Sequence, residues 1–159
     1  TPAEAEPRVR SGFSAKIDAG PAYYRLTRHD LFGFQARASL GAQIRDIGAI
    51  HGNFGVMRGE SDGLLDTTIL TFDPSWSFIF DRWRLGLGPQ FTYVVIDRVT
   101  RDDAVNLYGG AGRIFTTVDL VASDHANLTL GLTAQLGAMT DDVPLFGSAL
   151  SLGGRFKAP

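Results

Sequence analysis

The sequence contains no cysteine and no long apolar run. Without cysteine, neither a disulfide framework nor a thiolate metal site can form. No stretch approaches the roughly 20 consecutive apolar residues that a membrane-spanning helix requires, although 44% of the residues are hydrophobic. Residues 1–10 lack the apolar core of a signal peptide. The chain is therefore expected to be either a protein that is not exported or a mature, already processed form.

Lysine and glutamate are also scarce. The chain has 13 arginines but only two lysines and three glutamates, with a formal net charge of -2. The basic residues are scattered along the chain, which argues against nucleic acid as a partner. A soluble β-domain usually covers its wet face with charges of both signs, lysine and glutamate prominent among them. The chain has too few lysines and glutamates to cover such a face. At 159 residues it is most economically one domain.

What the sequence does have is alternation. From residue 12 to 156, apolar and polar or small residues alternate with period 2, and no helical stripe competes with them. The pattern predicts an all-β chain with an even number of strands, each long enough for the roughly 9–11 residues that a tilted strand needs to cross a bilayer. The predicted strands are 12–24, 31–45, 49–58, 67–81, 83–96, 106–121, 127–138 and 145–156.

The connections between these strands fall into two kinds. Those after the second, fourth and sixth strands are short, at 46–48, 81–83 and 122–126. The others are mostly longer and more polar, at 25–31, 59–66, 97–105 and 139–144. Such a pattern predicts a meander with tight turns at one end, here the turn end, and wetter loops at the other, here the loop end.

Three prolines fall inside predicted strands: Pro21, Pro74 and Pro89. Each removes a donor from the hydrogen-bond ladder, and a closed barrel has no free edge on which to place it. Bulges or local breaks are therefore expected at these positions.

The composition of the two strand faces decides which one is wet. The apolar faces carry no Asp, Glu, Lys, Arg or His, whereas the opposite faces consist of Gly, Ser, Thr, Gln and Ala with single charges. Small residues suit the narrow interior of a barrel with few strands, but a solvated exterior has no reason to be small. The prediction is an eight-stranded antiparallel up-and-down transmembrane β-barrel with a polar lumen and a lipid-facing apolar exterior.

Charges that face such a lumen must be paired or solvated. A network of ion pairs that plugs the lumen is the expected arrangement, with Asp73 as the partner of Arg37. An anion-attracting constriction is the alternative. The predicted lumen charges are Lys16, Asp18, Arg37, Asp73, Arg84, Arg113, Asp119 and Arg155.

Aromatic residues gather near both ends of the predicted apolar surface. Two aromatic belts on an otherwise aliphatic exterior are typical of the interfacial girdles of membrane barrels. The girdle at the turn end is predicted to contain Phe13, Phe80, Trp83 and Phe156, and that at the loop end Tyr23, Phe32, Tyr93 and Tyr108.

The last predicted strand carries the most specific local motif. It reads ALSLGGRF, with Leu150, Leu152 and Phe156 on one face. Together with the period-2 alternation over residues 12–156, this motif resembles those of the eight-stranded outer-membrane β-barrels of Gram-negative bacteria. These are the OmpA/OmpX-like group with its OmpW-like and PagL-like relatives. In that family the closing aromatic is often the final residue, whereas here Lys157, Ala158 and Pro159 follow it.

The resemblance implies a location and partners. It places the chain in the bacterial outer membrane, in contact with lipid and lipopolysaccharide, and it implies recognition of the last strand by the barrel-assembly machinery. Other envelope proteins are further candidate partners. The expected organisation is a flexible periplasmic segment over 1–11, the barrel over 12–156 and a tail over 157–159.

No residue pattern predicts catalysis, a cofactor or a metal site. His29, His51 and His125 are far apart and lack the spacing of metal ligands. The leading hypothesis is a non-enzymatic barrel with a structural or interaction role that it exercises through its extracellular loops. Membership of a larger envelope assembly is compatible with this role. The alternatives are a narrow OmpW-like channel for small or apolar solutes, an enzyme that modifies lipid A, with His51 near Ser39 and Asp18, and a soluble lipocalin-like carrier.

Overall fold

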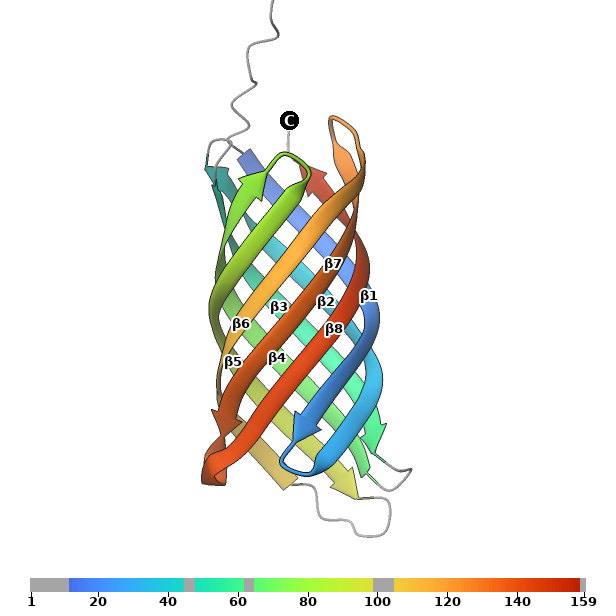
Figure 1. Cartoon of the computed structure of the whole chain (residues 1–159), viewed down its shortest axis with the longest axis vertical. Coiled ribbons are helices and arrows are strands. Elements are labelled where there is room, and N and C mark those ends of the chain that lie inside the picture. Colours follow the sequence, from blue (N-terminus) through green and yellow to red (C-terminus); the bar gives the residue numbers. More distant parts are fainter. Residues whose placement is uncertain (1–11, 45–47, 62–64, 99–104, 158–159) are drawn as a thin grey trace, which may run out of the picture.

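A computed structural model describes residues 12–44, 48–61, 65–98 and 105–157. They form a closed barrel in which each strand pairs antiparallel with the next and β8 pairs with β1, which confirms the predicted meander (Figure 1). No helix in these residues is long and apolar enough to span a membrane. The strands are β1 Gly12–Leu26, β2 His29–Ile44, β3 Gly48–Ser61, β4 Leu65–Phe80, β5 Trp83–Arg98, β6 Val105–Ala122, β7 Ala126–Met139 and β8 Val143–Lys157.

Several strands run further than predicted at the loop end, so the predicted loop over 25–31 is wrong. Only Thr27 and Arg28 separate β1 from β2. The polar residues beside them belong to the ladder, where Arg25 lies directly opposite Asp30. Polar side chains at the end of a strand look the same in sequence as a loop, so the alternation ends before the strand does.

The other predicted loops are shorter as well. A 3-10 turn of three residues, η1 Thr140–Asp142, joins β7 to β8. Strands β3 and β4 extend to Ser61 and from Leu65, so most of the predicted loop over 59–66 is also strand. The remainder of that loop, the centre of the loop over 97–105, residues 1–11 and residues 158–159 lie outside the described residues. The predicted contrast between long loops and short turns therefore fails for β1–β2 and β7–β8.

The predicted facing of the strands is confirmed. On β2, for example, Phe32 and Leu40 point outward and are 66% and 58% exposed, whereas Arg37 points inward and is 3% exposed. The register shifts once in the described ladders, between Asp119 and Val121 where β6 pairs with β7. This bulge ends the alternation on β6, so that Leu120 and Val121 are both exposed.

The prolines produce breaks in the ladder and no bulges. In the described pairing, β1 and β8 are not matched at residues 20–21, and β4 and β5 are not matched at residues 73–75. Pro21 lies in the first gap, and Pro74 and Pro89 lie on the two sides of the second. The register is the same before and after each gap, so the missing donors cost local pairing but do not shift the strands.

The lumen is polar through its middle and turn half, but its loop end is mainly apolar, with Ser61, Thr67 and Thr92 as buried polar residues there. There, inward side chains from β1, β2, β3, β4, β5, β7 and β8 form a buried cluster, here called the apolar plug. The prediction of a polar lumen therefore does not hold at this end. The plug consists of Ala22, Tyr24, Leu26, Leu31, Met57, Ile69, Val94, Met139, Leu145 and Ala149.

The tight turn after β1 gives a first prediction. Thr27 has a φ of 55°, in the left-handed region that a β-branched residue occupies at a cost. Thr27→Gly should therefore stabilise the barrel by about 1 kcal/mol, measured as a rise in the urea midpoint of the protein folded in lipid vesicles. Thr68→Gly, in the extended part of β4, should lower the midpoint. A lower midpoint for Thr27→Gly would show that the turn is not strained.

Candidate functional site

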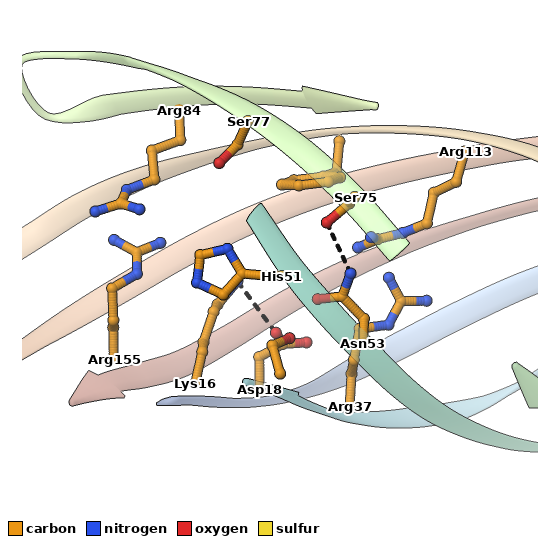
Figure 2. A pocket seen from close by; sticks show the side chains of 12 residues that line it. Lys16, Asp18, Arg37, His51, Asn53, Ser75, Ser77, Arg84, Arg113 and Arg155 are labelled. Carbon is orange, nitrogen blue, oxygen red and sulfur yellow. Dashed lines mark hydrogen bonds and ion pairs between the residues drawn. The ribbon is translucent and has the colours of Figure 1, made fainter. Parts of the chain in front are cut away.

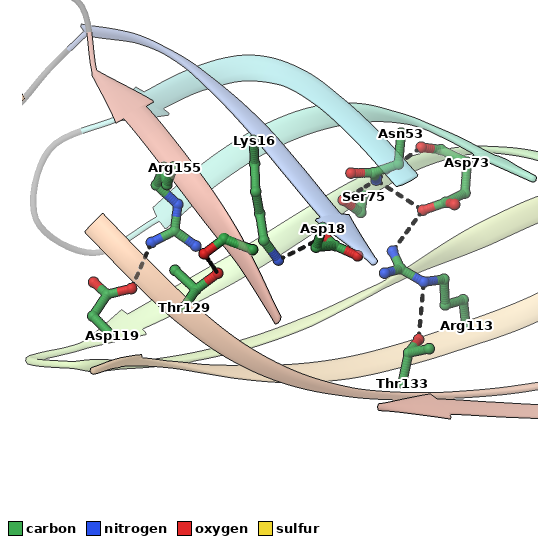
Figure 3. A network of polar contacts seen from close by, with 11 residues as sticks. Lys16, Asp18, Asn53, Asp73, Ser75, Arg113, Asp119, Thr129, Thr133 and Arg155 are labelled. Atoms are coloured by element: carbon green, nitrogen blue, oxygen red, sulfur yellow. Dashed lines mark hydrogen bonds and ion pairs between the residues drawn. The ribbon is translucent and has the colours of Figure 1, made fainter. Parts of the chain in front are cut away.

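Asp73 on β4 is the centre of the lumen network at mid-height. Its side chain is fully buried, and its Oδ2 accepts hydrogen bonds from Arg113 Nη1 on β6 and Asn53 Nδ2 on β3, both at 2.8 Å (Figure 3). Arg113 Nε in turn donates to Thr133 Oγ1 on β7 at 3.0 Å. Four strands are thus joined across the interior through one carboxylate.

Two further carboxylates hold cations nearer the turn end. Arg155 Nη1 lies 3.0 Å from Asp119 Oδ1, and Asn127 Nδ2 donates to the other oxygen of the same carboxylate at 2.9 Å. Lys16 Nζ lies 3.1 Å from Asp18 Oδ2 (Figure 3). All eight predicted lumen charges therefore lie in the lumen, and six of them form three ion pairs.

The remaining two, Arg37 and Arg84, have no carboxylate partner among the described residues. The predicted pair of Arg37 with Asp73 is wrong, because Asp73 pairs with Arg113 across the lumen. Arg37 lies opposite Asp18 in the ladder, yet none of its three guanidinium nitrogens has a hydrogen-bond partner in the described part of the chain. Arg84 Nη2 donates to Gln43 Oε1 at 3.3 Å, while its Nε has no such partner there.

Neutral side chains also belong to this network, and their pairing was not predicted from the sequence. Asn53 bridges Asp73 and Ser75, and Tyr24 Oη donates to Gln35 Oε1 at 2.9 Å at the boundary of the apolar plug. The period-2 pattern correctly places Gln35, Asn53 and Ser75 on inward positions of their strands. The pattern does not give their partners, because pairing depends on the reach of each side chain across the barrel.

His51 is the one histidine in the lumen, and its Nε2 lies 2.9 Å from Ser14 Oγ. The hydrogen bond resembles a nucleophile and its base, but among the described residues no carboxylate is hydrogen-bonded to this histidine. His29 begins β2 at the loop end, and His125 lies in the turn after β6 at the opposite end. In the described part of the chain, no cluster of His, Asp and Glu could hold a metal ion.

Around His51 lies a cavity of about 30 Å³, here called the charged chamber. Figure 2 shows the guanidinium groups of Arg84 and Arg155 directed toward one another on one side of His51, with Arg37 and Arg113 on the other. A larger space of about 380 Å³, here called the vestibule, opens at the turn end between Gln43, Arg84 and residues of the neighbouring turns. The lumen thus runs from the vestibule through the charged chamber to the apolar plug.

The aromatic residues predicted to form girdles lie on outward positions near both ends of the barrel. At the loop end, the rings of Tyr23 and Phe32 lie 5.1 Å apart and those of Tyr23 and Phe146 lie 6.4 Å apart. At the turn end, Trp83 and Phe80 face each other across the β4–β5 ladder, 56% and 60% exposed. The other members, Phe13, Tyr93, Tyr108 and Phe156, also lie on the outer face.

Beyond the aromatic residues, the outer wall becomes charged at the loop end. Arg58 Nη2 lies 2.9 Å from Asp66 Oδ2, and Asp30 accepts a hydrogen bond from Tyr23 Oη at 2.6 Å and pairs with Arg25. We call these five residues the loop-end rim. It places charges of both signs on the outer wall at this end.

The sequence matches no protein-family model and no curated protein. Its fold matches solved structures. Neisserial surface protein A is 18% identical with a TM-score of 0.77, and the match covers 93% of this chain and 98% of that one. Ail, the attachment invasion locus protein of Yersinia pestis, is 15% identical with a TM-score of 0.56, and the match covers 91% of this chain and 99% of that one. The N-terminal β-barrel domain of Pseudomonas aeruginosa OprF is 15% identical with a TM-score of 0.54, and the match covers 92% of this chain and 100% of that one.

These similarities extend over almost the whole of each chain, although few residues are identical. The matched proteins are eight-stranded outer-membrane β-barrels, the group that the sequence pattern resembles. At these identities the shared property is the arrangement of strands, and the functional residues of one protein are not transferred to another. The chain has the fold of the eight-stranded outer-membrane β-barrels, a closed meander with an apolar outer wall.

Proposed function

We propose that the chain is an integral protein of the bacterial outer membrane with a non-enzymatic, structural or interaction role, and that its lumen does not conduct. The apolar plug carries this proposal. Tyr24, Leu31, Met57, Ile69 and Leu145 come from five strands and are each at most 1% exposed, so they exclude water from the loop end of the lumen. A constriction of apolar side chains without water is a barrier to ions.

The charged chamber supports a non-enzymatic role, because it is too small for a lipid substrate. It is a small interior space of about 30 Å³, large enough for about two water molecules. A lipid A molecule cannot reach the Ser14–His51 pair through either the apolar plug or a wall of paired strands. A role as a lipid-modifying enzyme is therefore disfavoured.

Among the described residues, the outer wall is the main surface available for interactions. Because Thr27 and Arg28 alone connect β1 to β2, and η1 alone connects β7 to β8, these connections offer little surface to a partner. We therefore place the contacts with lipopolysaccharide and with neighbouring envelope proteins at the loop-end rim and the aromatic residues below it. Charged and hydroxyl groups beside aromatic rings suit the headgroup region of a membrane.

The last strand is the surface proposed for recognition by the barrel-assembly machinery. Phe146, Leu150, Leu152 and Phe156 lie on its outer face and are 42–54% exposed. The same strand closes the barrel by pairing with β1, so its recognition would precede closure.

Conductance in planar lipid bilayers tests the proposal. The purified wild-type protein should give no discrete openings, whereas a large porin inserted under the same conditions should. A variant with Met57→Ser, Ile69→Ser and Val94→Ser should admit water to the plug and allow rare openings. Discrete openings of the wild-type protein would overturn the proposal in favour of the narrow channel.

A further inference from the structure

The charged chamber contains more positive than negative charge. Its lining includes five cationic side chains but one carboxylate, that of Asp18. Two more carboxylates, Asp73 and Asp119, lie just outside the lining. The described lumen network therefore holds five cations and three anions. Two positive charges are left without compensation in a space closed to bulk water at the loop end. The cationic side chains are Lys16, Arg37, Arg84, Arg113 and Arg155.

Arg37 is where this excess is concentrated. It is 3% exposed, lines the chamber, and has no hydrogen-bond partner for Nε, Nη1 or Nη2 in the described part of the chain. A buried guanidinium that lacks both a counter-charge and acceptors for its N–H groups is strongly unfavourable. Asp73 does not bind Arg37, because its Oδ2 accepts from Arg113 and its Oδ1 has no hydrogen-bond partner among the described residues. An anion from solution would supply both the charge and the acceptor.

The dimensions of the chamber limit the choice of anion. One water molecule needs about 10–15 Å³ measured in the same way, so a space of about 30 Å³ holds about two water-sized groups. A chloride ion with one water molecule fits this space, whereas a phosphate or sulfate ion with its hydration does not. Arg84 lines both the chamber and the vestibule, so an ion from the turn end passes a cationic side chain on its way in.

We propose that the charged chamber binds one small monovalent anion of chloride size, with the guanidinium group of Arg37 as its main ligand. The neighbouring guanidinium group of Arg113, directed to the same side of the chamber, adds to the positive potential (Figure 2). The anion neutralises part of the excess charge and so stabilises the closed lumen. Binding to the folded state alone makes stability depend on the anion concentration.

The test is urea unfolding of the full chain in vesicles of neutral lipid, at constant ionic strength, with chloride replacing gluconate. Gluconate is too large for the chamber. If the dissociation constant is about 1 mM, raising chloride from about 1 to 100 mM should increase the folded-to-unfolded ratio of the wild-type protein by about 50-fold. Arg37→Met should lose this response and, in gluconate alone, should be at least as stable as the wild-type protein because it removes an unpaired charge.

Arg58→Met is the matched control, since Arg58 belongs to the exposed loop-end rim and its loss should leave the chloride response intact. A second measurement uses the unchanged protein: crystals soaked in bromide should show an anomalous peak at hydrogen-bond distance from the Arg37 guanidinium. A chloride response that Arg37→Met retains, or no response in the wild-type protein, would show a lumen filled by water only. If Arg37→Met fails to fold, the absence of a bromide peak would overturn the proposal by itself.

Discussion

Asp73→Ala should destabilise the folded barrel by about 3–5 kcal/mol, the cost of removing one partner from a buried ion pair. The carboxylate is fully buried and holds Arg113 and Asn53 at 2.8 Å. Without it, Arg113 joins Arg37 as a buried cation without a counter-charge in the middle of the lumen. Urea unfolding in lipid vesicles, followed by the gel shift between folded and unfolded forms, measures the change.

Two further variants identify the cause of this loss. Asp66→Ala removes the same group from the ion pair with Arg58, where the Arg58 side chain is 75% exposed, and should have a much smaller effect. Asp73→Ala combined with Arg113→Met removes both charges and should recover part of the lost stability. If the double variant is as unstable as Asp73→Ala alone, packing at this site matters more than charge.

The facing of each strand could be predicted from the sequence because it depends on residue parity alone. Once Phe32 is assigned to the outer wall, Phe34 must also face outward and Arg37 must face the lumen. This inference needs no knowledge of which strands are neighbours. It fails only where the backbone is irregular, as at the bulge beside Leu120, where the alternation is locally lost.

The choice of partners in the lumen could not be predicted in the same way. Arg37 and Asp73 both face inward at similar heights, which made them a plausible pair. The structure pairs Asp73 with Arg113 instead, from β6, across the interior. Which cation reaches a carboxylate depends on the stagger of the strands and on the length and direction of each side chain, and none of these appears in a period-2 pattern.

The apolar plug did leave a signal in the sequence. At the loop end, neighbouring residues on one strand are both apolar, as in Tyr23-Tyr24, Leu31-Phe32 and Ile69-Leu70. One member of each pair faces outward and the other must face the lumen. Such pairs of neighbouring apolar residues therefore indicate an apolar interior at that end.

Leu132→Arg should cost about 2–4 kcal/mol if the outer wall lies in a bilayer. Leu132 is 55% exposed and lies near the middle of β7, between Ala126 and Met139. An arginine there would face the centre of the hydrocarbon, where a charge is most costly. The same unfolding measurement in lipid vesicles gives the change in free energy.

The matched control is Val121→Arg, which introduces the same charge at a site that is 61% exposed but lies next to the turn-end limit of β6. Because the cost of a charge falls toward the membrane surface, this variant should lose at most about 1 kcal/mol. A soluble barrel predicts no difference, since an exposed apolar residue replaced by arginine would cost little stability at either position. Small and equal losses of stability for the two variants would therefore contradict a transmembrane wall. A larger loss for Leu132→Arg than for Val121→Arg would support it, because in water the cost would not depend on the position along the barrel.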